Sequence, residues 1–209
     1  MARKNRPNPR EERLLRRICS TRLVKQSFLI ICEGKNTEPE YFNSFRLTSA
    51  KVKTIGQGIN TIGLVQKALR IKEDERRKGN SYDQYWVVFD KDDFSDNDFN
   101  NAIVLAESNG LKVAYSNQAF ELWFLLHFSL ITGPMHRNHY ASKLNEYLGF
   151  TYNKEHNTAT QMYEELLPYQ KYAIKNAKTL LLQMQCISPA QAESSTTVHL
   201  LVEELNKYI

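Results

Sequence analysis

The sequence predicts an α/β fold: a parallel sheet flanked by helices, followed by a mostly helical C-terminal part. Short apolar runs rich in Val, Ile and Phe alternate with segments of helical periodicity through the first half of the chain. The stretches between these runs are long enough for the helical crossovers that join parallel strands. Beyond residue 115 the strand pattern stops, and helical periodicity continues to the C-terminus.

Four strands are expected in the first half of the chain. They span Ser27–Cys32, Lys51–Ile55, Tyr85–Phe89 and Lys112–Tyr115. Most of these runs are rich in β-branched and aromatic residues, which favour strands. The second run is the weakest of the four, because two of its five residues are lysines.

Three helices are expected between these strands. The first begins at Thr37 and runs to about Arg46, with Glu40 three residues on from Thr37 as in a capping box. The second, Thr61–Arg77, has amphipathic spacing, and the third, Asp96–Asn109, ends at a glycine.

The C-terminal half is predicted to be helical. Its expected helices are Gln118–Phe128, Tyr140–Leu148, Thr158–Gln185 and Thr196–Tyr208. We therefore expect an α/β domain at residues 27–130 and a helical extension packed on it at residues 131–209.

Length and composition exclude several classes of protein. With 209 residues, 42% of them hydrophobic, the chain can form one substantial core. No apolar run approaches the roughly 20 residues that span a bilayer, and no secretory signal pattern follows the basic N-terminus. The three cysteines, Cys19, Cys32 and Cys186, are far apart, as in proteins kept in a reducing cytosol. We expect a cytoplasmic protein without membrane contact.

Positive charge is concentrated at the N-terminus. Residues 1–26 contain nine Lys or Arg and two Glu, a net charge of +7, while the whole chain carries +5. Basic arms of this kind often contact nucleic-acid phosphates. A solubilising tail or a helix that docks on a partner subunit is the alternative interpretation.

Acidic residues follow two of the expected strands. Glu33 ends the first, and Asp90 and Asp92 follow the third. The carboxyl ends of parallel strands meet at one edge of a sheet, where ligands usually bind. Oxygen ligands of this kind suit Mg²⁺ (or Mn²⁺), so the sequence predicts a metal site formed by these three carboxylates. Ordinary loop and capping acids are the alternative.

Other polar residues near this edge are candidates for substrate contact or catalysis. Lys35, Lys91 and Asn117 are placed to contact a phosphate. Glu121 lies in a segment that is apolar on every face, so its carboxylate is expected to be buried near the same edge and to act in catalysis. A structural salt bridge to an arginine is the alternative for Glu121. Glu38 stays open between the site and a helix-dipole role.

Aromatic residues are frequent in the helical half. Tyr163, Tyr169 and Tyr172 are candidates for stacking on nucleic-acid bases, although packing in a core or an interface is the commoner use of such residues. His127 is interpreted as a core histidine rather than a general base.

Four motifs in order carry a resemblance to a known family. They are Ile31-Cys-Glu33-Gly34-Lys35-Asn-Thr37-Glu38-Pro39-Glu-Tyr41-Phe42, Val88-Phe-Asp90-Lys-Asp92-Asp93-Phe94, Ser116-Asn117-Gln-Ala-Phe120-Glu121-Leu-Trp123 and Ser195-Thr-Thr197-Val. With these motifs the chain resembles the RloB-like family, which contains a Toprim-like domain and occurs in restriction-linked and abortive-infection loci of bacteria and archaea.

The resemblance implies a fold and an activity. It implies a Toprim-like sheet domain in which Glu33 matches the Toprim glutamate, and Asp90 and Asp92 match its aspartate pair, holding Mg²⁺ for phosphoryl-transfer chemistry. It further implies a nuclease effector that acts on RNA or DNA in defence against phage, with an ATPase as a possible partner.

Two rival functions use the same residues differently. A non-catalytic subunit would bind nucleic acid or an ATPase and use the acids for a structural metal. A phosphate-acceptor signalling domain would use Asp90 as the acceptor, but that layout prefers an acid pair after the first strand, where this chain has only Glu33.

Overall fold

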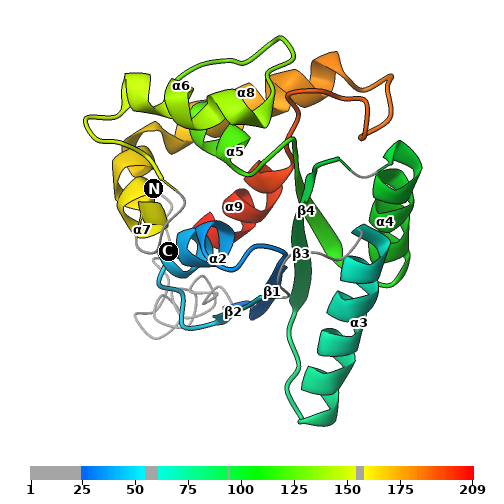
Figure 1. Cartoon of the computed structure of the whole chain (residues 1–209). Helices are drawn as coiled ribbons and strands as arrows, with labels where there is room; N and C mark the ends of the chain where they lie inside the picture. Colours follow the sequence, from blue (N-terminus) through cyan, green and yellow to red (C-terminus); the bar gives the residue numbers. More distant parts are fainter. Residues whose placement is uncertain (1–24, 55–60, 94, 154–157) are drawn as a thin grey trace, which may run out of the picture.

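A four-stranded parallel sheet with helices on both faces forms the centre of the molecule (Figure 1). The computed structural model describes residues 25–54, 61–93, 95–153 and 158–209. Most of the basic arm expected at residues 1–26 lies outside these ranges. The strands are β1 (Phe28–Cys32), β2 (Ala50–Thr54), β3 (Gln84–Lys91) and β4 (Lys112–Asn117). The helices are α2 (Thr37–Asn43), α3 (Thr61–Arg77), α4 (Asp96–Ser108), α5 (Glu121–Leu125), α6 (Tyr140–Tyr147), α7 (Thr158–Leu166), α8 (Gln170–Gln183) and α9 (Val198–Asn206), with 3₁₀ turns η1 (Arg137–His139) and η2 (Leu167–Tyr169).

The strand order is β2-β1-β3-β4, with every neighbouring pair parallel. The α/β fold predicted from the alternating pattern is thus confirmed. Since β1 lies beside β3 and β3 beside β4, the three strands that end in candidate site residues are neighbours. Within the described ranges, no helix is long and apolar enough to cross a membrane.

Side chains alternate between two hydrophobic clusters, one on each face of the sheet. Leu29 and Ile31 of β1 pack toward α3 and α4, while Phe28, Ile30 and Cys32 pack toward α2, α5 and α9. Figure 1 shows α3 and α4 on one side of the sheet and the remaining helices on the other. Because both faces are covered, the sequence of β1 is a continuous apolar run.

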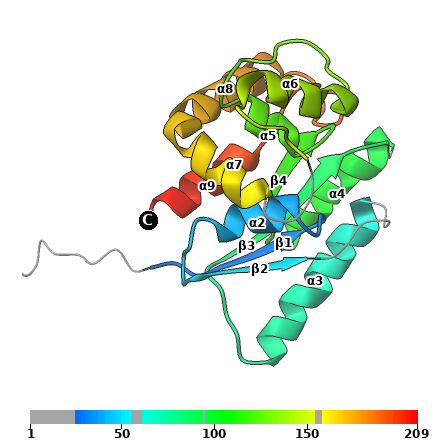
Figure 2. The same cartoon turned by 60° about the vertical axis from the view of Figure 1, so that its left-hand side comes forward.

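The C-terminal helices extend the second cluster. Residues of α6, α7, α8 and α9 belong to the same buried core as α2, α5 and one face of the sheet. Figure 2 shows α6 and α8 beside α5, and α7 beside α2. The boundary near residue 130 stays a prediction.

The two edge strands are covered differently. Residues 195–197 run along the carboxyl half of β4, where the Thr197 N–H donates to the Tyr115 carbonyl (2.8 Å) and the Asn117 N–H to the Ser195 carbonyl (2.8 Å). On β2, the lysines Lys51 and Lys53 donate to the buried carboxylate of Glu75 of α3 at 2.9 and 2.6 Å. Lysines on an edge strand also discourage pairing with other chains.

Two helices differ from the prediction. α2 begins at Thr37 as predicted, but the capping position is Asn36, so Thr37 cannot act as the cap of the expected capping box with Glu40, and the Asn36 side chain makes no capping hydrogen bond. α2 also ends at Asn43 and not near Arg46. The single helix expected over Thr158–Gln185 is divided into α7 and α8 around Pro168, which cannot donate a backbone hydrogen bond and disrupts a helix interior.

The segment around the third and fourth strands also differs. β3 continues through Asp90 and Lys91, so Asp90 lies within the strand, paired in register with Ser116. The helix expected over Gln118–Phe128 is shorter, because Gln118 has a φ of 69° and its N–H bonds back to the Lys91 carbonyl (2.9 Å). The chain therefore turns sharply after β4 before α5 begins.

Gly110 ends α4 in a left-handed conformation. Its φ is 70°, and the next N–H, that of Leu111, donates to the Ala106 carbonyl (2.9 Å), as in a Schellman cap. An L-residue in this conformation costs about 1–2 kcal/mol. We expect Gly110→Ala to lower the free energy of unfolding by that amount in urea titrations. Gly133→Ala is the matched control, because Gly133 has open space around its Cα and no positive φ; equal stability of both variants would contradict the prediction.

Candidate active site

The acids of β1 and β3 meet at the carboxyl end of the sheet. The Glu33 N–H continues the β1–β3 ladder by donating to the Val88 carbonyl (2.9 Å). The Asp90 N–H in turn donates to Glu33 Oε2 (3.3 Å), so the Glu33 side chain lies across the end of β3. The convergence expected from strand order is therefore present for these two residues.

Asp90 is also tied to the turn that precedes α5. The Phe120 N–H donates to Asp90 Oδ2 at 3.1 Å. This bond is available because Gln118 reverses the chain direction after β4 and brings the start of α5 against β3. A backbone N–H donating to a carboxylate favours its charged form.

A pocket of about 310 Å³ opens beside these residues. It is lined by Gly34, Lys35, Asn36, Thr37, Glu38, Asp90, Phe120 and Glu121. Its walls thus come from the β1–α2 loop, the start of α2, the end of β3 and the start of α5. Three of the lining residues are acidic (Glu38, Asp90 and Glu121), and one, Lys35, is basic. Acidic residues therefore predominate in the pocket.

Glu38 reaches into this site over a glycine. Its side chain is buried, and a Cβ built on Gly34 would lie 2.0 Å from Glu38 Oε2. Only a glycine at position 34 therefore leaves room for the Glu38 carboxylate where it lies. The sequence left the role of Glu38 open, and the structure puts it among the site acids.

Burial and the neighbouring acids raise the pKa of Glu33. Burial raises the pKa of its carboxyl to about 7, the hydrogen bond from the Asp90 N–H opposes that rise, and the charges of Asp92 and Glu38 add to it. Four acids from β1, α2 and the end of β3 therefore interact at one sheet edge. Grouped carboxylates of this kind are typical of functional sites.

Glu121 is buried at the start of α5, as the sequence predicts. Its Oε1 accepts a hydrogen bond from the hydroxyl of Tyr152 (2.8 Å). The pKa of the Tyr152 hydroxyl is raised by burial and by the Glu121 charge. Tyr140 is a second buried tyrosine on this side, and its pKa is raised by burial and by the charges of Asp90 and Glu121.

The three residues predicted to contact substrate lie in different surroundings. Lys35 is exposed and lines the pocket. The Lys91 ammonium contacts Asp96 (3.3 Å) at the start of α4 and lies outside the pocket lining. Asn117 is buried, and its Nδ2 donates to the carbonyls of Pro189 (3.0 Å) and Ala192 (2.8 Å), which ties down the segment before α9.

The donor chemistry of the site suits a hard divalent cation. All the acids supply oxygen, and Mg²⁺ commonly binds one or two carboxylates plus water and substrate phosphate. In the described residues, no three His, Cys, Asp or Glu side chains are grouped closely enough to hold a metal ion. Asp90 and Glu121 lie on one pocket with Glu33 at its side, each held by its own hydrogen bond, so a bound cation would require some of these side chains to reorient.

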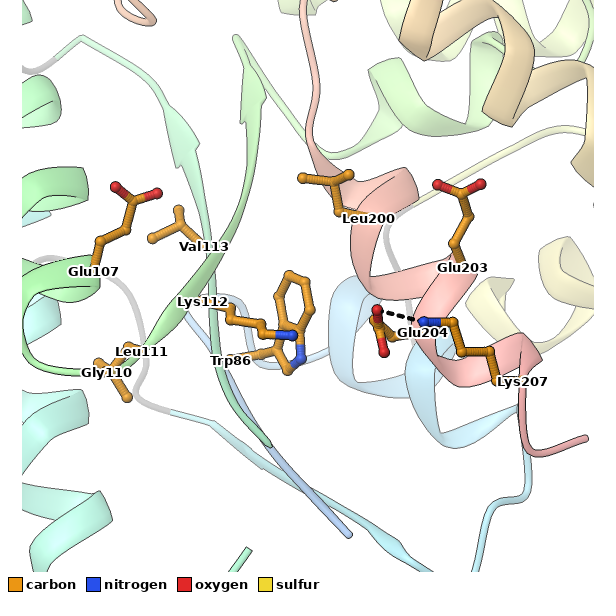
Figure 3. Close-up of a pocket in the computed structure, with 10 residues that line it drawn as sticks. All are labelled: Trp86, Glu107, Gly110, Leu111, Lys112, Val113, Leu200, Glu203, Glu204 and Lys207. Carbon is orange, nitrogen blue, oxygen red and sulfur yellow. Dashed lines mark hydrogen bonds and ion pairs between the residues drawn. The ribbon is translucent and has the colours of Figure 1, made fainter. Parts of the chain in front are cut away.

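A second cavity, of about 710 Å³, lies at the other end of the sheet. It lies between the start of β4, the end of α4 and α9 (Figure 3). Most of its charged groups are already engaged, since Lys207 pairs with Glu204 (2.7 Å), Glu203 pairs with Lys178 (2.5 Å) and Lys112 lies over the Trp86 ring (5.3 Å). Parallel strands direct their carboxyl ends away from this cavity, so the acids of β1 and β3 do not reach it.

Sequence reasoning did not find Tyr140 and Tyr152. Both follow α5 by many residues, and neither belongs to a recognisable motif. Their place beside Glu121 and Asp90 results from the packing of the C-terminal helices on α5, which no local pattern encodes.

The comparisons with known proteins bear on this region. The model of a family described as RloB-like protein matches residues 28–205, which include every carboxylate of the site. No curated protein and no solved structure gave a match. Since the family model covers most of the sequence, the chain belongs to the RloB-like family.

Proposed function

We propose that this protein is a metal-dependent nuclease that hydrolyses phosphodiester bonds in RNA or DNA. The observation that carries the proposal is the gathering of Glu33, Glu38, Asp90 and Glu121 around one pocket at the carboxyl end of a parallel sheet. The likeness of the Glu33 and Asp90-x-Asp92 motifs to Toprim domains supports the same chemistry. A role as an anti-phage effector, with an ATPase partner, rests on that resemblance.

Each residue has a part in the proposed reaction. Glu33, Asp90 and Asp92 would hold Mg²⁺ or Mn²⁺, which when bound neutralises phosphate charge and lowers the pKa of a bound water. Lys35, exposed at the pocket, would contact the phosphate. Glu121 is the candidate proton acceptor, kept in place by the Tyr152 hydroxyl.

A cleavage assay tests the proposal. The full chain would be incubated with transfer RNA, single-stranded RNA and plasmid DNA, in Mg²⁺, Mn²⁺ or EDTA. Cleavage that requires the divalent ion supports a nuclease and ranks its substrates. Binding of polynucleotide without cleavage in any condition, also with an ATPase partner present, would favour a non-catalytic subunit.

Gly34 provides a test of the role of Glu38. An added Cβ at position 34 must displace the Glu38 carboxyl, which is the far end of a flexible side chain. We therefore expect Gly34→Ala to fold with nearly wild-type stability but to lose about 10- to 100-fold in cleavage rate, the range typical when groups that position a site are disturbed. Gly133→Ala controls for the substitution itself. Full activity of Gly34→Ala would show that the Glu38 position is irrelevant.

A further inference from the structure

An aromatic pocket lies beyond the far end of α5 from Glu121. It has a volume of about 680 Å³, and four of its lining residues are aromatic: Phe128, Tyr147, Tyr169 and Tyr172. They come from the turn after α5, the end of α6, η2 and α8. Helices α5, α6 and α8 lie together in both views (Figures 1 and 2), and η2 contacts α8. We call these four residues the aromatic pocket.

The rings of the aromatic pocket contact one another, and two of them are largely exposed. Phe128 and Tyr147 stack with centroids 5.0 Å apart and planes 10° apart, and Tyr169 lies 5.6 Å from Phe128. Tyr169 is 45% exposed and Tyr172 62% exposed. Tyr163, grouped with them in the sequence, instead packs on Phe45 at 4.9 Å as part of the core. Core packing therefore explains Tyr163 but not Tyr169 and Tyr172.

Lysines lie on two of the helices that form the aromatic pocket, α6 and α8. Helix α8 carries three lysines and no acid. Two of them, Lys171 and Lys175, are exposed on either side of Tyr172 in the sequence. On α6, the Lys143 ammonium lies 5.4 Å from the centroid of the Tyr147 ring and also pairs with Glu146. Exposed rings with lysines beside them are the combination that binds single strands, whose bases stack while their phosphates meet cations. An aliphatic protein partner would not need these charges.

His127 adds a polar group to the same pocket. It is 2% exposed, lines the pocket, and its Nδ1 lies 2.9 Å from the Trp123 carbonyl. A carbonyl can only accept, so Nδ1 carries the proton. Burial lowers the pKa of this imidazole to about 4, so at neutral pH Nε2 is an acceptor, and it has no partner among the described residues. Buried acceptors rarely lack a donor. Because Nε2 itself is covered, a nucleobase N–H reaches it only after neighbouring side chains move.

We propose that the aromatic pocket binds bases of a single-stranded nucleic acid, the strand on which the carboxylate pocket acts. Glu121 begins α5 and His127 lies two residues beyond its last residue, Leu125, so even a fully extended chain would separate the two by no more than about 20 Å and one strand can contact both sites. This inference rests on the proposed function for its second half only. Binding by the aromatic pocket does not require cleavage and is measured without it.

Fluorescence anisotropy with labelled oligonucleotides tests the proposal. The probes are single strands of about 12 nucleotides, in RNA and DNA form, and a duplex of the same length. Binding would be measured in EDTA at about 0.1 M salt, which fixes charge screening. The double variant Tyr169→Leu/Tyr172→Leu keeps apolar bulk but removes both rings. We expect it to bind single strands at least about tenfold more weakly than the wild type, because each base–aromatic stack contributes strongly to affinity.

Matched variants separate stacking from other effects. Tyr169→Phe/Tyr172→Phe keeps both rings and should bind within about twofold of the wild type. Leu182→Ala changes another exposed apolar side chain of α8, and should also leave binding unchanged. Single-strand binding by the Leu/Leu variant within about twofold of the wild type would overturn the proposal. An equal loss for duplex and single strand, or no nucleic-acid binding by the wild type, would overturn it as well.

Failure of the nuclease proposal gives a different pattern. If the wild type never cleaves but the Leu/Leu variant loses single-strand binding, the aromatic pocket stands as a binding site and the catalytic proposal falls. If cleavage depends on Asp90 while the Leu/Leu variant binds normally, the catalytic proposal stands and the aromatic pocket has another use.

Discussion

Replacing Asp90 by Asn is expected to lower metal-dependent cleavage by at least about 100-fold, because disturbing groups that merely support metal ligands already costs 10- to 100-fold. The substitution removes a negative charge from the end of β3 while keeping the shape of the side chain. Its remaining carbonyl oxygen can still accept the hydrogen bond that the Phe120 N–H gives to Asp90 Oδ2 (3.1 Å). The fold around α5 should therefore be kept, and only the cleavage rate should fall.

Single-turnover cleavage rates at saturating Mg²⁺ measure this effect, and urea unfolding checks that the variant is folded. Asp74→Asn is the matched control, since Asp74 is largely exposed and lies on α3, which covers the face of the sheet opposite α2 and α5. If Asp90→Asn cleaves at the wild-type rate while folding normally, Asp90 is not part of the catalytic site. An observed activity would then come from another site or from a contaminant.

The location of the site could be predicted because it depends on strand ends. Glu33 and Asp90 follow or end apolar runs, and parallel strands place their carboxyl ends at one edge whatever the details of packing. The burial of Glu121 was predictable in the same way, from a segment with no polar face. These inferences need only local pattern and sheet direction.

The partners of those residues could not be predicted, because they depend on tertiary packing. Tyr152 meets Glu121 only because the segment after α6 folds back over α5. Asn117 appeared free to contact substrate, but residues 189–192 pass close enough to take both of its amide hydrogen bonds. The division between α7 and α8 was different, because Pro168 is a local signal for a helix break. The prediction passed over it because helical periodicity continues on both sides of Pro168.

The Glu33→Gln variant is expected to become more stable than the wild type as the pH rises, when both are free of divalent metal. The pKa of Glu33 is about 7 in the folded protein, against an ordinary value of 4.5. A raised folded pKa means that the folded state binds the proton more tightly than the unfolded state. The resulting stability is fully present below pH 4.5 and is lost as the pH rises through 7.

The size of the effect follows from the shift. A difference of about 2.5 pKa units corresponds to about 3 kcal/mol between low and high pH. Glu33→Gln has no titrating group at this position, so its free energy of unfolding relative to the wild type should rise by up to that amount between about pH 5 and pH 8. Urea unfolding in EDTA at several pH values measures the difference. Glu165→Gln, an exposed change on α7, is the control and should show no such trend.

Divalent metal should restore the stability that the wild type loses at high pH, because the cation binds the ionised Glu33 carboxylate in the folded state and not in the unfolded state. At pH 8, adding Mg²⁺ should therefore stabilise the wild type in proportion to the logarithm of its concentration, and stabilise Glu33→Gln less. A pH trend without this Mg²⁺ response would mean that Glu33 is a strained acid within the fold rather than a ligand. A Mg²⁺ response that is equal in both proteins would place the ion elsewhere. Only the combination of the pH trend and its selective reversal ties the raised pKa of Glu33 to a metal site.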